Sequence, residues 1–142
     1  MALKTYNLDF GWEIAVPENW DMDKKETGSY IFFPEDPEDE TTLYASVLHS
    51  ETNLGLTPER IMKETFEKSI PENAQEVTVI TEVHCKAFFL LGADGVYRIG
   101  AGFFTNGELL SLNIYAKGEE KAREAASGFS QIKFTRGRKN AF

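Results

Sequence analysis

The sequence is poor in the residues that most often carry chemistry. Its 142 residues include one cysteine, Cys85, and two histidines, His49 and His84. A single cysteine can form neither an intrachain disulfide nor a multi-cysteine zinc site. Such sparing use of cysteine is compatible with a reducing compartment, and we expect a cytoplasmic protein.

Long hydrophobic runs and catalytic motifs are also missing. The longest apolar stretch, residues 87–91, is far too short to cross a bilayer, so we expect no membrane insertion. The alternating N-terminal residues exclude a secretory signal in the chain as given, although a leader already removed would leave no trace. The sequence has no phosphate-binding glycine loop, dinucleotide fingerprint, nucleophile elbow or zinc-protease motif. We therefore expect no cofactor and no bound metal.

Neither histidine completes a catalytic set. His84 and Cys85 are neighbours in a predicted strand, where adjacent side chains point to opposite faces and cannot readily form a nucleophile–base pair. A pair between Cys85 and His49 on different strands stays open, but no pattern supports it. We predict no catalytic residues.

Acidic residues outnumber basic ones, and the net charge is −8. Residues 133–142 hold four basic side chains and no acid. Removing these four positive charges leaves −12 on the preceding 132 residues. An acidic body repels phosphate backbones, so we expect no nucleic acid as a partner. The charge favours a protein partner with a basic surface.

Length and composition are those of one ordinary domain, with 42% hydrophobic and 27% charged residues. We expect this domain to cover residues 1–134, followed by a basic, mobile tail at 135–142. Alternation at period two predicts strands, which we place at residues 8–16, 29–33, 43–49, 77–83 and 86–91.

Two helices are expected beside these strands. Thr57 and Pro58 supply a cap and a first helical residue for a helix that ends near Ile70. A second helix follows Gly118 and stops at Gly128. The second helix carries a narrow stripe of small residues, Ala122, Ala125 and Ala126. The predicted fold class is α+β: a predominantly antiparallel sheet with two helices packed on it.

The strongest local signal is Asn106-Gly107 between two alternating runs, which predicts a two-residue hairpin turn. This turn pairs Phe104 with Leu109 and fixes the register outward from there. One face of the hairpin is then apolar and must be core. Its residues are Tyr97, Ile99, Ala101, Phe103, Leu110, Leu112, Ile114 and Ala116.

The opposite face of the hairpin has two glycines and polar edges. Its candidate binding residues are Arg98, Gly100, Gly102, Ser111, Asn113 and Tyr115. Missing side chains let a ligand or a partner backbone approach the sheet, with Arg98 as the group that recognises an anion. In the alternative reading, which we favour, the alanine stripe of the second helix lies over Gly100 and Gly102.

A second candidate is an acidic run before the third strand, formed by Glu35, Asp36, Glu38, Asp39 and Glu40. Carboxylates of this kind can bind a hard cation such as Ca²⁺. The run lacks the spacing of a calcium loop and contains Pro37, so we favour a solvated acidic surface loop.

The opening strand and turn read Phe10-x-x-x-Ile14-x-Val16-Pro17-x-x-Trp20, and the last structured segment is expected at residues 129–134. This pattern and the order of the elements resemble the PsbP-like superfamily. That superfamily includes the photosystem II extrinsic subunit, the Ran-binding nuclear-import factor and bacterial DcrB-like proteins. The resemblance implies an α/β/α sandwich that acts in binding, assembly or adaptor roles.

Two functional hypotheses follow. The first is a non-catalytic protein-binding module: an adaptor, a chaperone or an immunity-type partner. The alternative is a small-molecule or anion-binding protein that uses the glycine-floored sheet face around Arg98. Fold resemblance by itself does not decide between them.

Overall fold

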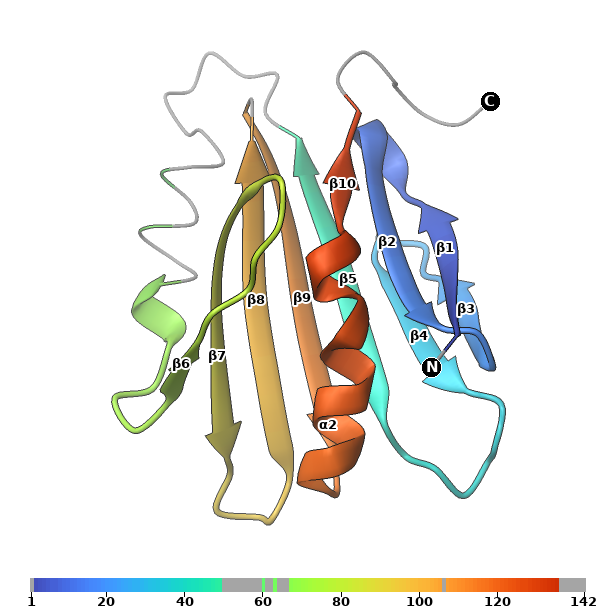
Figure 1. The fold of residues 1–142 in the computed structure, drawn as a ribbon, viewed down its shortest axis with the longest axis vertical. Helices are drawn as coiled ribbons and strands as arrows, with labels where there is room; N and C mark the ends of the chain where they lie inside the picture. Colours follow the sequence, from blue (N-terminus) through green and yellow to red (C-terminus); the bar gives the residue numbers. More distant parts are fainter. Residues whose placement is uncertain (1, 50–59, 61–62, 64–66, 106, 136–142) are drawn as a thin grey trace.

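Figure 1 shows the computed structural model, which describes residues 2–49, 60, 63, 67–105 and 107–135. The strands of this part are β1 (Leu3–Asn7), β2 (Trp12–Pro17), β3 (Trp20–Lys24), β4 (Tyr30–Pro34), β5 (Thr42–His49), β6 (Gln75–Val77), β7 (His84–Leu91), β8 (Tyr97–Thr105), β9 (Glu108–Ala116) and β10 (Lys133–Phe134). The helical segments are α2 (Glu119–Ala125) and the 3₁₀ turns η1 (Asp9–Gly11), η3 (Glu67–Ser69) and η4 (Ala126–Gln131).

The strands form two antiparallel sheets. The large sheet has the order β3-β4-β5-β9-β8-β7-β6, and the small sheet has the order β1-β2-β10. The predominantly antiparallel sheet predicted from the sequence is therefore present. In the part of the chain that the structure describes, no helix is long and apolar enough to span a membrane.

The hairpin formed by β8 and β9 determines which of their side chains face the core. β8 and β9 pair in the predicted register, with Phe104 opposite Leu109 and Ile99 opposite Ile114. Gly107 has φ +81°, the left-handed conformation that a tight hairpin turn requires. Seven of the eight residues of the predicted apolar face are buried, namely Ile99, Ala101, Phe103, Leu110, Leu112, Ile114 and Ala116, and Tyr97 is partly buried against them.

The small sheet, α2 and η4 together cover this core face. α2 contacts β8 and β9, and η4 contacts β2. The rings of Phe103 on β8 and Phe129 on η4 meet edge to face at 5.7 Å. Tyr6 of β1 meets Phe32 of β4 in the same way at 5.2 Å. The core is thus a layer between the large sheet on one side and a mixed layer of strands and helix on the other (Figure 1).

The expectation of one strand over residues 8–16 is wrong. β1 and β2 form a hairpin, and Leu8–Trp12 is its turn, closed by a bond of 2.8 Å from the Leu8 amide to the Trp12 carbonyl. Phe10 (φ 62°) and Gly11 (φ 94°) both adopt left-handed conformations there. The alternation through Trp12, Ile14 and Val16 reflects a real strand, but its extension back to Leu8 crosses a turn.

Other predicted elements differ in part. The predicted helix over 57–70 lies mostly outside the described residues, and residues 67–69 of it are the 3₁₀ turn η3. The strand over 77–83 is wrong, because β6 ends at Val77 and the chain then leaves the sheet edge. Strands at 29–33, 43–49 and 86–91 correspond to β4, β5 and β7.

The predicted end of the second helix at Gly128 is also wrong. α2 starts after Gly118 as expected, but the chain continues from Ala126 to Gln131 as η4. Thr135 belongs to the folded part, since its amide donates to the Gly11 carbonyl at 2.9 Å. The rest of the predicted tail lies outside the described residues.

Gly128 instead marks the closest approach between η4 and β2. A Cβ added at Gly128 would overlap the backbone carbonyl of Ala15, which cannot rotate away as a side-chain end can. We expect Gly128→Ala to lower the free energy of unfolding by about 3 kcal/mol or more, measured by urea denaturation. At Gly118 an added Cβ meets nothing within 4 Å, so Gly118→Ala is the matched control and should change stability little. Equal stability of the two variants would contradict this packing.

Candidate functional site

One face of the large sheet is the core face, on which α2 packs, and the face on the other side is called the outer face here. It carries the predicted site, because residues alternating with the core residues of β8 and β9 point to it. Arg98 lies opposite Tyr115 across β8 and β9, and Gly100 lies opposite Asn113. The Arg98 Nη2 donates to the Asn113 Oδ1 at 2.9 Å. Three of the predicted residues, Arg98, Asn113 and Tyr115, therefore form one cluster.

On the outer face, the space over Gly100 is filled by Phe88 of β7 and not by the alanine stripe. Phe88 of β7 pairs with Gly100, and a Cβ on Gly100 would lie only 2.5 Å from the Cε1 atom of the Phe88 ring. Phe88 is 1% exposed. The expectation that the alanine stripe covers Gly100 and Gly102 is wrong, since Ala122 and Ala125 pack into the core on the other side of the sheet.

Arg98 is held in place by two aromatic rings. Its guanidinium lies 5.3 Å from the centroid of the Phe88 ring and 5.7 Å from that of Tyr115. Both distances are within the range of cation–π attraction. Its Nε is buried and has no hydrogen-bond partner among the described residues. Arg98 is thus fixed in position and keeps donor capacity for a further acceptor.

The remaining predicted residues lie beside this cluster. Gly102 is buried and sits opposite Lys86 of β7. The Lys86 ammonium forms an ion pair of 3.0 Å with Glu67, which places η3 on the outer-face side of β7. Ser111 is half-buried and lies opposite Ser46 of β5.

An exposed apolar strip crosses the outer face from β4 over β5 to β9. Tyr44 and Tyr115 are 41% and 37% exposed, and their rings meet edge to face at 5.8 Å. With Thr42 and Asn113 they line a shallow depression of about 460 Å³. The strip, called the aromatic strip below, consists of the exposed residues Tyr44, Leu48 and Tyr115 and the half-buried residues Ile31 and Phe33.

Sequence reasoning found Tyr115 but missed the rest of the aromatic strip. Tyr44 reaches Tyr115 because β5 pairs with β9, with Thr42 opposite Tyr115 and Tyr44 opposite Asn113. That pairing joins segments about seventy residues apart, as the register shows. Alternation within residues 43–49 already places Tyr44 and Leu48 on the face opposite Leu43, which is the signal that could have found them.

The acidic loop between β4 and β5 is ordered by its own carboxylates. Asp36 accepts a bond from the Glu38 amide at 3.0 Å. Asp39 accepts the Thr41 amide at 3.1 Å and the Thr41 hydroxyl at 2.6 Å. Glu35 is exposed beside them.

Two lysines at the start of α2 approach this loop. Lys117 pairs with Glu40, and Lys121 pairs with Asp39 at 3.3 Å. Within the described residues, no group of three or more His, Cys, Asp or Glu side chains is arranged to hold a metal ion. The loop is therefore a partly neutralised surface segment flanking one end of the aromatic strip.

The histidines and the cysteine lie apart. Cys85 is on β7 and His49 on β5, with β8 and β9 between them, so they cannot form a pair. Burial raises the pKa of the Cys85 thiol to about 12, which keeps it protonated and unreactive at neutral pH. His84 projects to the outer face, where its ring meets Phe104 at 4.8 Å.

His49 has a partner that the sequence did not reveal. Its Nδ1 contacts the buried carboxylate of Glu108, 2.6 Å from Oε1, and its ring stacks on Phe10 with centroids 4.1 Å apart. Glu108 follows the hairpin turn directly and lies opposite His49 in the β5–β9 register. The stack of Phe10 on His49 joins η1 to the large sheet, and the contact of His49 with Glu108 links β5 to β9.

Gly100 gives a direct test of how the outer face is filled. We expect Gly100→Ala to destabilise the protein by about 1–3 kcal/mol in urea denaturation, because the added methyl overlaps the buried Phe88 ring. In a Phe88→Leu background the same change should cost less, since the ring is gone. If Gly100→Ala lowers the free energy of unfolding as much in the Phe88→Leu variant as in the wild type, the assignment of Phe88 as the group over Gly100 is contradicted.

Asp39 gives a test of the acidic loop. Burial of this carboxylate by itself favours the neutral acid, but hydrogen bonds from Thr41 and Lys121 outweigh it and hold the pKa of Asp39 below its ordinary value of 3.8. Asp39 thus stabilises the fold above that value, and this contribution is lost as the pH falls through the lowered pKa. Thr41→Val should move the pKa of Asp39 upward in a carboxyl NMR titration, whereas Thr5→Val on exposed β1 should not. A wild-type Asp39 that titrates at or above 3.8 would overturn this account.

Comparisons with known proteins support the fold. No family model matches the sequence, and no curated relative matches it. A crystal structure at 1.50 Å of a protein from Bacteroides thetaiotaomicron VPI-5482 is similar, with a TM-score of 0.62 and 15% sequence identity. The match covers 96% of this chain and 50% of that chain, so this chain spans half the length of the protein it matches. At this identity the similarity shows the fold alone.

Proposed function

We propose that this protein is a non-catalytic protein-binding module, of the adaptor, chaperone or immunity type, and that it binds a partner with a basic surface. The observation that carries the proposal is the aromatic strip. Tyr44 and Tyr115 are large, exposed side chains in contact with each other on a flat sheet face. Exposed apolar side chains gathered on one face are typical of a protein interaction site.

The composition of this face resembles the energetic centre of protein interfaces. Tyrosine and arginine are enriched at such centres because each combines a rigid, apolar body with hydrogen-bonding groups. Arg98 lies against Tyr115 at the edge of the strip and is already positioned by Phe88 and Asn113. Little side-chain freedom is then lost when a partner covers it.

Charge around the strip supports a basic partner. Asp21 and Asp23 of β3 are exposed and lie opposite Phe33 and Ile31 of the strip. The acidic loop adjoins the end of the strip where β4 leads into β5. The body of the chain carries a large negative charge, which accelerates encounter with a basic protein and weakens with salt.

The same proposal includes a cytoplasmic location and a relationship to the PsbP-like proteins. The protonated, partly buried Cys85 is compatible with a reducing compartment. The antiparallel sheet with α2 on one face is compatible with the layered fold of that superfamily. The resemblance to that superfamily implies binding, assembly or adaptor roles, which agrees with the role proposed for the aromatic strip.

An anion-binding function is the second candidate. It is favoured by the buried Nε of Arg98, which lacks a hydrogen-bond partner among the described residues, and by the adjoining depression at Asn113 and Tyr115. A small anion could accept from Arg98 at the edge of this depression. Saturable thermal stabilisation by inorganic phosphate that disappears in Arg98→Gln would favour this candidate over the first.

The protein-binding proposal is tested by affinity capture followed by measurement with the purified partner. We expect one stoichiometric companion with a basic surface. The double variant Tyr44→Ser, Tyr115→Ser should weaken its binding by about tenfold or more, because two central aromatic contacts are lost. Raising the ionic strength from about 0.05 to about 0.5 M should weaken it further.

Leu91→Ser is the matched control, since Leu91 is 49% exposed but lies outside the strip, on the core-face side of β7. It should leave the affinity unchanged. A companion that binds the double variant as tightly as the wild type would refute the aromatic strip as the contact. Binding that is insensitive to salt would refute the role of the acidic surroundings.

A further inference from the structure

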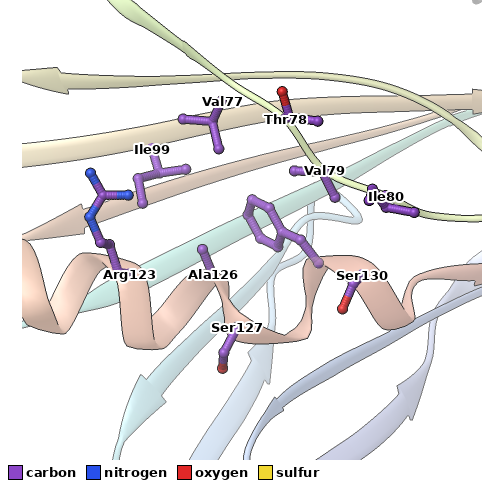
Figure 2. Close-up of a pocket in the computed structure, with 10 residues that line it drawn as sticks. Val77, Thr78, Val79, Ile80, Ile99, Arg123, Ala126, Ser127 and Ser130 are labelled. Carbon is purple, nitrogen blue, oxygen red and sulfur yellow. The ribbon is translucent and has the colours of Figure 1, made fainter.

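A pocket on the other side of the large sheet is separate from the aromatic strip. After β6 the chain leaves the sheet edge, and residues 78–83 cross the core face toward η4 (Figure 1). This segment, called the strap, is tied down by a bond of 3.0 Å from the Thr81 hydroxyl to the Ile132 carbonyl. Between the strap and the α2–η4 helix lies a cavity of about 390 Å³ (Figure 2).

Six of the ten residues that line the cavity are apolar, and Thr78, Arg123, Ser127 and Ser130 are the others. Val77 and Val79 line it from β6 and the strap, while Ala126 and Phe129 line it from η4. Ile99, a core residue of β8, also lines it. The volume is within the range of pockets that bind small ligands. A hydrocarbon chain is the kind of group that such walls accommodate.

The mouth of the cavity carries an exposed apolar side chain. Ile80 on the strap is 85% exposed, although its neighbour Val79 packs against the core. Ser127 and Ser130 of η4 are also among the lining residues, and their side chains point away from the strap (Figure 2). A ligand that filled the cavity would therefore meet apolar surface at its entrance as well as inside.

One end of the cavity has a positive charge. Arg123 of α2 lines it, and its guanidinium lies 4.7 Å from the centroid of the Phe89 ring. The Arg123 Nε donates to Glu119 at 2.9 Å, in an exposed pair one helical turn apart. Such pairs are weak, and this bond uses one of the five guanidinium donors. Arg123 can therefore donate to a second carboxylate.

We propose that this pocket binds an amphipathic carboxylate of the fatty-acid class. Its hydrocarbon chain lies between the strap and η4, and its carboxylate lies on Arg123. The apolar walls select the chain, and the single cation at one end selects the charge and the orientation. This site is independent of the protein partner proposed for the outer face.

The experiment compares decanoate with decanol, which has the same chain without the charge. Each is titrated into the full chain and followed by calorimetry and by NMR of labelled methyl groups. We expect decanoate to bind at one site and to shift the methyl signals of Val77, Val79 and Ala126. Arg123→Gln should weaken decanoate about tenfold, the effect of losing one charge-assisted bond, and should leave decanol unchanged.

Two further variants complete the design. Lys121→Gln removes a neighbouring positive charge of α2 that pairs with Asp39 rather than lining the pocket, and it should leave decanoate binding unchanged. Ala126→Leu places a larger side chain in the cavity and should weaken binding of both compounds, with circular dichroism to show that it folds. The proposal fails if decanoate shows no saturable binding, if Arg123→Gln and Lys121→Gln have equal effects, or if folded Ala126→Leu binds both compounds as tightly as the wild type.

Discussion

The register between β8 and β9 determines which of their side chains are buried in the core and which lie on the outer face. The turn at residues 106 and 107 is two residues long, so the pairs beyond it are fixed, with Thr105 opposite Glu108 and each later pair following. Because side chains alternate across a strand, this register sends Ile99 and Ile114 into the core and leaves Arg98 and Tyr115 on the outer face. A slip of one residue would exchange the two faces.

The two faces of the large sheet then have different uses. On the core face, α2, η4 and the small sheet bury the apolar side chains, and the strap closes the side of this layer near β7. The cavity beside Arg123 arises at that margin, where the strap and η4 separate enough to leave a space. On the outer face, Phe88 fills the space over Gly100, while Tyr44, Leu48 and Tyr115 stay exposed. The two proposed binding surfaces are thus separated by the large sheet.

The sequence predicts the parts of this fold that depend on neighbouring residues. Asn106-Gly107 and its flanking alternation are a local signal, and the predicted pairs are those observed. The same kind of signal failed at residues 8–16, because Phe10 takes a left-handed conformation that side chains rarely adopt and that alternation does not reveal. Contacts between distant segments were not predictable. The position of Phe88 over Gly100 depends on the β7–β8 register, and the face covered by the alanines depends on how the chain returns after β9.

The structure brings three of the predicted residues, Arg98, Asn113 and Tyr115, together on the outer face and places Tyr44 beside them. Arg98, Asn113 and Tyr115 were found because they share one face of the hairpin, whereas Tyr44 joins them only through the pairing of β5 with β9. The most direct measurement of the central claim is a set of cross-strand nuclear Overhauser contacts in the 16.0 kDa chain. We predict contacts between Ile99 and Ile114 and between Thr42 and Tyr115. Contacts that place Ile99 opposite Asn113 or Tyr115 would contradict the register and with it both proposed binding surfaces.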